Sequence, residues 1–315
     1  MRILIGYDGS ECSEAALEDL QRAGLPTDVE AVVMTVADVW LWPEDETTSD
    51  SDVLGIERAR EHARRALREA RELAARASER LRSRFPEWKV ATEAVGDSPA
   101  WALVKKADEW EPDLIVVGSH GRTAIERFVL GSVSQKVLYE ARCSVRIARR
   151  ALRPAEDTLR IIVGVDGSPS SQAALEMAAA RAWPEGTEIR VLSAIDGALS
   201  LGESFALRWI ARDDERAVEQ ARAQLAALIE PLFAGRGWSP TVIVRRGSAK
   251  RALVEEAEKW QADSVFVGAR GLRTRERSSL GSVASVVASR APCSVEVVRK
   301  ERIASAGSTG AGLAL

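Results

Sequence analysis

Two glycine-rich segments in this chain have the residue types and the spacing of an anion-binding loop. The first is Gly118-Ser119-His120-Gly121, then nine residues, then Gly131-Ser132. The second has the same spacing, with Gly268-Ala269-Arg270-Gly271 followed by Gly281-Ser282. Glycine lets a ligand approach the backbone closely, and N–H groups at the start of a helix attract negative charge. The pattern therefore predicts a phosphate-binding cradle that occurs twice.

An aspartate precedes each glycine-rich segment within a repeated phrase. Ile5-Gly6-Tyr7-Asp8-Gly9-Ser10 recurs as Val163-Gly164-Val165-Asp166-Gly167-Ser168. Asp8 and Asp166 each follow an apolar run, where a carboxylate suits a ribose hydroxyl or a metal ion. The end of the next apolar run, Val36-Ala37, suits a base through backbone hydrogen bonds and apolar contact. In a parallel sheet all these positions share the edge beyond the carboxyl ends of the strands.

A simple turn is the competing interpretation of these glycines, because a single glycine after a strand more often belongs to a turn than to a ligand site. Two copies of the whole pattern favour nucleotide binding, most clearly in the first copy. We predict that a side chain at Gly118 would block a ligand's approach to the backbone and that Gly121 lets the loop turn back. Gly131-Ser132 should offer free N–H groups and a hydroxyl to an anion.

Alternating strands and helices must position these residues. Apolar runs predict strands over 3–7, 30–36, 89–94, 113–117 and 144–148, and again over 161–165, 189–194, 241–245, 264–267 and 294–298. Helical patterns cover 56–81, 99–110 and 129–139, and a first helix starts with Ser10 or Ser13 as its N-cap. This order predicts an α/β fold of two tandem doubly wound, Rossmann-like domains. Each has a five-stranded parallel sheet with helices on both faces.

The two copies differ by one insertion. The offset between equivalent residues is 158 at Asp8 and Asp166 but 150 at Gly118 and Gly268, so the first copy has eight more residues in between. The stretch 41–52 holds five acids and no apolar period, and it reads as a solvated loop rather than a metal or partner site because ligand spacing is absent. We expect domains at 1–149 and 159–300, a linker at 150–158 and a flexible tail at 301–315.

Composition excludes several classes of protein. The 315 residues are 46% hydrophobic and 29% charged, which is typical of a soluble globular protein in which each 150-residue copy can bury a core. A net charge of −3 argues against nucleic-acid binding. The chain shows neither a signal peptide nor a run of apolar residues that would span a membrane. Three cysteines are too few for a disulfide framework or a zinc site, so we expect a cytoplasmic protein.

The paired motifs resemble those of tandem universal stress proteins, over roughly 1–149 and 159–300. In that family G-x2-G-x9-G-[ST], with the first-strand aspartate, marks the ATP-binding subgroup, whose fold is like that of the adenine nucleotide alpha hydrolases. The resemblance implies ATP, or ADP or AMP, with or without Mg²⁺. It assigns nucleotide contacts in the first copy to Asp8, Val36, Gly118, His120, Gly121, Gly131, Ser132, Val133 and Ser134. In the second copy it assigns them to Asp166, Ala194, Gly268, Arg270, Gly271, Gly281, Ser282 and Val283.

The second copy departs from the family pattern. Arg270 stands where the first copy has His120, and the spacer 272–280 holds three arginines that either bind phosphate or are solvated. Ala284 replaces Ser134, which removes one phosphate donor. The first site is therefore the stronger prediction.

Little in the sequence points to an enzyme. It lacks G-x4-G-K-[ST], and Cys143 and Cys293 begin strands, where a structural thiol is the usual role. His62 reads as a surface residue, and His120 as a loop or ligand contact rather than a general base. The equivalent pairs Trp88 with Trp238 and Trp110 with Trp260 predict packing, and packing is also preferred for Trp40 and Trp42.

We expect a nucleotide-binding regulator of stress survival that is read by an unidentified downstream protein, with a nucleotide-free scaffold or a weak Mg-dependent ATPase as alternatives. The resemblance implies an intramolecular pseudo-dimer in which 144–148 pairs with 294–298. A homodimer of tandem chains stays open.

Overall fold

The computed structural model describes residues 1–39, 53–121, 130–154, 157–195, 215–271 and 280–299. The acidic stretch 41–52, Trp40, Trp42, most of both spacers and the expected flexible tail lie outside them. The described residues form one ten-stranded sheet with the order β3-β2-β1-β4-β5-β10-β9-β6-β7-β8. The first-half strands are β1 Arg2–Gly6, β2 Glu30–Ala37, β3 Lys89–Gly96, β4 Leu114–Gly118 and β5 Ser144–Ala148. The second-half strands are β6 Arg160–Val165, β7 Glu188–Ile195, β8 Thr241–Arg246, β9 Ser264–Gly268 and β10 Ser294–Val298.

Strand pairing confirms the predicted fold class. Each half is a five-stranded parallel sheet. The halves join where β5 and β10 run antiparallel, with Arg146 opposite Glu296 in the register. The pairing of 144–148 with 294–298 within one chain is therefore also confirmed.

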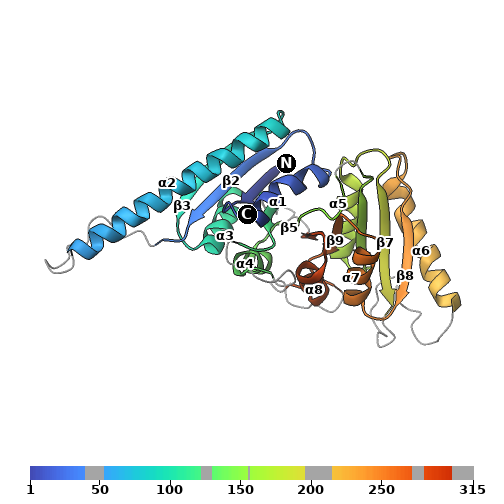
Figure 1. The fold of residues 1–315 in the computed structure, drawn as a ribbon. Helices are drawn as coiled ribbons and strands as arrows, with labels where there is room; N and C mark the ends of the chain where they lie inside the picture. The colour runs from blue at the N-terminus through green and yellow to red at the C-terminus, as the bar shows by residue number, and fades with distance from the viewer. Residues whose placement is uncertain (40–52, 122–129, 155–156, 196–214, 272–279, 300–315) are drawn as a thin grey trace, which may run out of the picture.

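Helices cover both faces of the sheet (Figure 1). Their bounds are α1 Glu11–Asp19, α2 Val53–Arg84, α3 Pro99–Trp110, α4 Ser132–Glu140, α5 Pro169–Ala180, α6 Glu215–Phe233, α7 Ala249–Lys259 and α8 Ser282–Arg290, with a short 3-10 helix at Leu20–Arg22. Buried residues of α3, α4, α7 and α8 share a single core that runs across both halves. On the other face α1 and α2 cover one core, and α5 and α6 cover another. The expectation that each copy buries its own core therefore holds for one face only.

Local sequence explains where these helices start. Ser10 caps α1, because its hydroxyl accepts from the N–H of Ser13, and Ser168 caps α5 in the same way. The helix predicted over 129–139 begins instead at Ser132, with Gly131 in extended conformation as its N-cap. Within the described residues, no helix combines the length and apolarity needed to cross a membrane.

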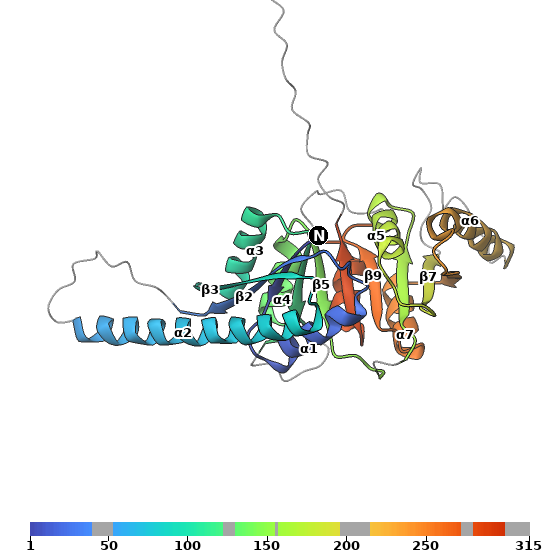
Figure 2. The same cartoon turned by 90° about the horizontal axis from the view of Figure 1, so that it is seen from above.

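Helix α2 presents a stripe of small apolar residues to the sheet. Ala70, Ala74, Ala77 and Leu81 are buried at three- and four-residue spacing, whereas many arginines and glutamates of the same helix face solvent. The first turns of α2 extend past the ends of β2 and β3 (Figure 2). The helix therefore stands as a wall beside the carboxyl edge of the first half-sheet.

The tryptophan pairs pack as predicted. Trp88 is buried and stacks on Phe85 with ring centroids 4.1 Å apart, and Trp260 is buried beneath the guanidinium of Arg190. Trp110 and Trp238 are half-buried against the core clusters. None of the four forms an open stacking surface for bases.

Candidate functional site

The carboxyl ends of the first-half strands and the adjacent face of α2 enclose a cavity of about 850 Å³. This volume lies within the range of roughly 300–1,000 Å³ that small-molecule sites occupy. Gly118 does not line the cavity. The other residues predicted for the first site all do, namely Asp8, Val36, His120, Gly121, Gly131, Ser132, Val133 and Ser134.

Asp8 and the two ends of the glycine motif lie against one another. A Cβ placed on Gly121 would stand 3.1 Å from Oδ2 of Asp8, and one on Gly131 would stand 3.2 Å from Cα of His120. The N–H of Gly131 donates to the carbonyl of Ser119 at 2.9 Å, which ties the start of α4 to the loop after β4. The backbone of Gly121 is not left-handed, so the prediction that glycine is needed there for the turn is not supported. Any side chain at 121 would instead crowd the Asp8 carboxylate.

The first turn of α4 supplies hydrogen-bond donors to the cavity. The first N–H groups of a helix have no intrahelical acceptor, and the N-cap Gly131 has no side chain to accept from them. Because the Gly131 N–H is already bonded to Ser119, the donors left for an anion belong to Ser132, Val133 and Ser134. The Ser134 hydroxyl is not one of them, since it donates to the Gly118 carbonyl at 2.6 Å. The prediction that Ala284 removes a phosphate donor in the second copy was therefore wrong.

Gly118 has a different role from the one predicted. A Cβ there would lie 2.7 Å from both the carbonyl carbon and the carbonyl oxygen of Cys12. Gly268 repeats this, because its Cβ would lie 2.5 Å from the carbonyl carbon of Ser170. Both glycines let the first turn of a helix, α1 or α5, cross a strand at backbone contact. They shape the edge of the sheet and do not themselves face the cavity.

His120 lines the cavity and has one ring nitrogen without a hydrogen-bond partner in the described part of the chain. Its Nδ1 lies 3.1 Å from the Ser119 hydroxyl, whereas Nε2 is buried and has no partner among the described residues. Burial, and to a smaller extent the positive charge of Arg149, lower the pKa of His120 below its usual 6.5. At neutral pH the ring is therefore uncharged, and it serves as a hydrogen-bonding group rather than as a cation.

We expect the pKa of His120, measured by NMR on histidine-labelled protein, to lie below 6.5. The folded state then binds this proton more weakly than the unfolded chain, so acidification below about pH 6.5 should cost stability. His62 is the other histidine, and a His120→Asn variant assigns the two signals. A His120 signal that titrates at or above 6.5 would contradict the burial of the ring.

Helix α2 and one strand residue also line the cavity, as do Asp38, Val39, Pro99 and Leu130, and sequence reasoning missed them. His62, Ala66, Glu69, Ala70 and Leu73 line it from α2. Thr35, next to Val36 on β2, also lines it and is 2% exposed. A hydroxyl within the apolar run 30–37 was the available signal for Thr35. Nothing comparable marked the α2 residues, although His62 is exposed as predicted.

The second copy repeats part of this geometry. A Cβ on Gly271 would lie 2.7 Å from Oδ2 of Asp166, and one on Gly281 would lie 3.4 Å from Cα of Arg270. The Ser168 hydroxyl donates to the Arg270 carbonyl, and the Arg270 N–H donates to the Ser170 hydroxyl. Ala194 lies near the carboxyl end of β7, and Ser282 and Val283 begin α8.

Electrostatics differ between the copies. The side chain of Arg270 is exposed, and burial together with the charge of Arg270 lowers the pKa of Arg299 to about 10. The second motif therefore has an exposed arginine where the first has a neutral histidine. The spacer arginines at 273, 275 and 277 lie outside the described residues.

The cysteines near the sheet seam are protonated thiols. Burial raises the pKa of Cys143 to about 11 and that of Cys293 to about 12. Within the described ranges, no three histidine, cysteine, aspartate or glutamate side chains are grouped as metal ligands. The polar groups at the first site are N–H groups, hydroxyls, an imidazole and a carboxylate.

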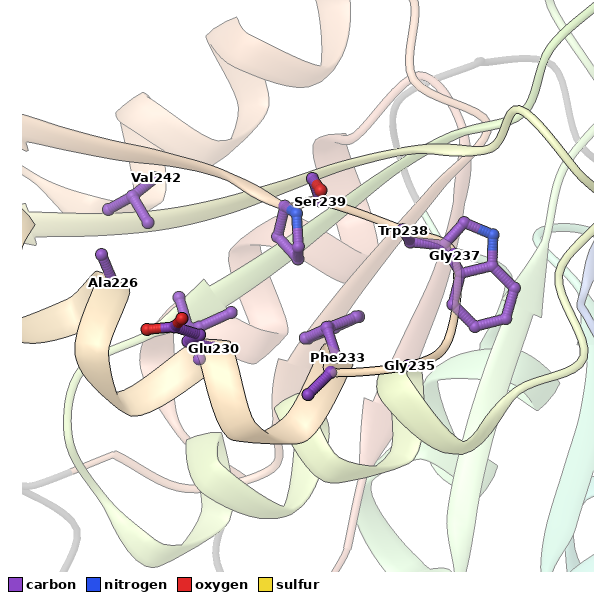
Figure 3. Close-up of a pocket in the computed structure, with 11 residues that line it drawn as sticks. Ala226, Glu230, Phe233, Gly235, Gly237, Trp238, Ser239 and Val242 are labelled. Carbon is purple, nitrogen blue, oxygen red and sulfur yellow. The ribbon is translucent and has the colours of Figure 1, made fainter.

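A separate cavity lies beside β8, the strand of the second half-sheet farthest from the seam (Figure 3). It measures about 560 Å³ between α6 and the start of β8, with Glu230 and Phe233 on the helix and Val242 on the strand. Trp238 and the glycines before it line one end. No residue of either glycine motif reaches it, so it is not part of the predicted sites.

Comparison with known proteins bears on these motifs. The model of the universal stress protein family matches residues 1–149 and again 158–299. Universal stress protein Rv2005c of Mycobacterium tuberculosis is 30% identical over 308 residues, which cover 95% of this chain and 97% of the relative. A relative from Mycolicibacterium smegmatis is also 30% identical over 308 residues, covering 94% and 96%. The solved structure of a universal stress protein from Archaeoglobus fulgidus has the same fold, with a TM-score of 0.61 at 20% identity over 95% of this chain and 98% of that one.

Proposed function

Because the chain belongs to the universal stress protein family, we propose that its first domain binds an adenine nucleotide and that occupancy of this site regulates a partner protein. The second domain is proposed as a weaker site for the same ligand. In this proposal the protein acts as a cytoplasmic sensor and not as an enzyme. A nucleotide fits the donors of the first cavity better than a bare metal ion does, since those donors are chiefly N–H groups.

One observation carries the proposal. Asp8 lines the same cavity of about 850 Å³ as Ser132, Val133 and Ser134, the first residues of α4. N–H groups at the start of a helix bind anions, and a carboxylate accepts hydrogen bonds from sugar hydroxyls, so this pairing fits a nucleotide.

The residues divide the nucleotide between them. The N–H groups of Ser132, Val133 and Ser134 would hold phosphate oxygens, because helix N-termini stabilise anions. The Asp8 carboxylate would accept from ribose hydroxyls. Val36 would contact the base, whereas the Ala37 carbonyl already accepts from Val39 and Asp97. When bound, the nucleotide would supply negative charge beside Gly121 and Leu130, which flank the spacer in the sequence and line the cavity, and this is how occupancy would reach the surface that a partner reads.

Calorimetric titration of ATP with Mg²⁺ tests this proposal. We expect micromolar binding by the parent chain and at least a tenfold loss, about 1.4 kcal/mol, in Gly121→Trp, whose side chain would fill the space beside Asp8. Gly271→Trp is the matched variant in the second copy, and it reports whether that site contributes. Both variants need an unchanged circular dichroism spectrum.

Absence of binding by the parent, after any co-purified nucleotide is removed, would overturn the proposal and favour a nucleotide-free scaffold. Release of ADP above background in the same samples would instead favour a weak Mg-dependent ATPase.

A further inference from the structure

An arginine follows the last strand of each half and crosses the seam between the halves. Arg149 comes directly after β5 and Arg299 directly after β10, at equivalent places in the two copies. The Arg149 N–H donates to the Ser294 hydroxyl of the second half at 2.9 Å. The Arg299 N–H donates to the Ser144 hydroxyl of the first half at 3.2 Å. The backbone of each arginine is therefore anchored to a serine of the opposite half.

The two arginine side chains reach the end of a helix in the opposite half. Nη2 of Arg299 donates to the Leu138 carbonyl of α4 at 2.5 Å. Nη2 of Arg149 donates to the Ala288 carbonyl of α8 at 2.6 Å. Nη1 of each arginine donates to a second carbonyl, in the short segment between that helix and the next strand. The same pair of hydrogen bonds thus occurs twice, once in each direction across the seam.

The carbonyls that these arginines contact are helix ends that need an outside donor. The last four carbonyls of a helix have no intrahelical partner. In α4 the Ala141 N–H donates to the Val137 carbonyl, and the Leu138 carbonyl, which comes next, receives Arg299 instead. A positive charge at this end also suits the helix dipole. Each arginine therefore acts as the C-terminal cap of a helix from the other half.

The two capped helices are the ones that the glycine motifs begin. Helix α4 starts directly after Gly131, and α8 starts directly after Gly281. The helices lie on either side of the seam (Figure 1), where the hydroxyl oxygens of Tyr139 and Ser285 are 2.9 Å apart. Each helix has only nine residues, so a constraint on its C-terminal end also sets where its first N–H groups lie.

We propose that Arg299 and Arg149 are positioning residues, each of which holds the phosphate-binding helix of the opposite half, so that neither site is complete without a residue from the other half. This inference rests on the proposed function, because it concerns the placement of the N–H groups proposed to bind phosphate. Neither arginine lines the first cavity. Arg299 reaches the first site through α4, and Arg149 reaches the second site through α8.

Full-length variants with one site blocked make this crossed dependence measurable by calorimetry. Gly271→Trp leaves the first site open, and Gly121→Trp leaves the second. In the Gly271→Trp background Arg299→Leu should weaken ATP binding about 3- to 20-fold because it frees the end of α4, and Arg149→Leu should weaken it less. In the Gly121→Trp background the order should be reversed. Arg299→Lys keeps a charge that can bond one carbonyl, so it should recover part of the loss at the first site.

Hydrogen exchange without nucleotide tests the contact itself. Arg299→Leu should speed exchange of the α4 amides more than that of the α8 amides, and Arg149→Leu should do the reverse. A general loss of stability at the seam would speed exchange in both helices alike. This measurement also reports on α8 if the second site binds too weakly for calorimetry.

Two results would overturn this inference alone. Equal effects of Arg299→Leu and Arg149→Leu at the first site would show that the arginines only stabilise the seam. Crossed exchange with unchanged affinity would show that phosphate binding does not depend on how the helix ends are held. In both cases ATP binding by the parent would leave the proposed function standing, whereas a parent that binds nothing would overturn both. If the leucine variants do not fold, Arg299→Lys and Arg149→Lys should show the same order.

Discussion

Arg146→Leu is expected to lower the free energy of unfolding by about 3–5 kcal/mol, because it leaves buried carboxylates without their partner. The Arg146 side chain is fully buried in β5. Its Nε and Nη2 donate to the two carboxylate oxygens of Asp19 at 2.6 and 3.0 Å, and Nη1 lies 3.3 Å from Glu296 across the seam. Nη2 also donates to the Ser264 hydroxyl.

This cluster alternates in charge across the two halves. Asp19 and Arg146 come from the first half, and Glu296 and Arg181, which are bonded to each other, come from the second. Arg146 and Glu296 are the third residues of β5 and β10 and face each other in the register. A seam between two copies of the first half would set Arg146 against Arg146. The charges therefore favour pairing of the first half with the second, as well as stabilising the seam.

Chemical denaturation of the full chain measures the effect, and Arg142→Leu is the matched control. Arg142 lies just before β5 and pairs with Asp108 at 3.5 Å with both side chains largely exposed, so its loss should cost less than about 1 kcal/mol. Glu296→Leu should be destabilising too, and the double variant should lose less than the sum of the single losses because the residues are in contact. An Arg146→Leu variant as stable as Arg142→Leu would contradict the proposed importance of the cluster.

The strands were predictable because most of their apolar runs are buried on both faces, with the edge strands β3 and β8 as the exceptions, and the predicted bounds fall within two residues of those observed. The Arg146 cluster was not predictable. A lone arginine in a buried strand is visible in the sequence, but its partners Asp19 and Glu296 lie 127 and 150 residues away. Asp19 meets it when α1 packs on β5, and Glu296 meets it only when the two halves dock.

The candidate site divides in the same way. Asp8, His120 and the start of α4 follow strand ends in the chain, so topology alone brings them to one edge. The α2 wall depends instead on the angle at which a long helix crosses that edge, which residue spacing does not set. Gly118 was recognised as a necessary glycine, but its contact with Cys12 comes from packing of α1 on β4 and could not be inferred from a loop motif.

The close approach of Gly118 to the Cys12 backbone gives the second large prediction. Gly118→Ala should lower the free energy of unfolding by about 1–3 kcal/mol or more. The new methyl group would lie 2.7 Å from the Cys12 backbone, and backbone atoms in the first turn of α1 cannot rotate away as a side chain can. Helix α1 would have to move off β4, and Asp8 and Ser10 would move with it. Thermal unfolding of Gly118→Ala should therefore show a lower midpoint.

Gly121→Ala is the control from the same motif. Its methyl group would meet only Oδ2 of Asp8, at 3.1 Å, and a carboxylate at the end of a side chain can shift at little cost. This variant should unfold within about 0.5 kcal/mol of the parent while binding ATP more weakly, since the Asp8 carboxylate is displaced. Gly118→Ala should unfold at a lower temperature than the parent even without ligand. Its weaker ATP binding should be a consequence of that loss of stability. If Gly118→Ala were as stable as the parent but failed to bind ATP, the packing role would be wrong. The prediction that a side chain at position 118 blocks the approach of a ligand to the backbone would then be correct.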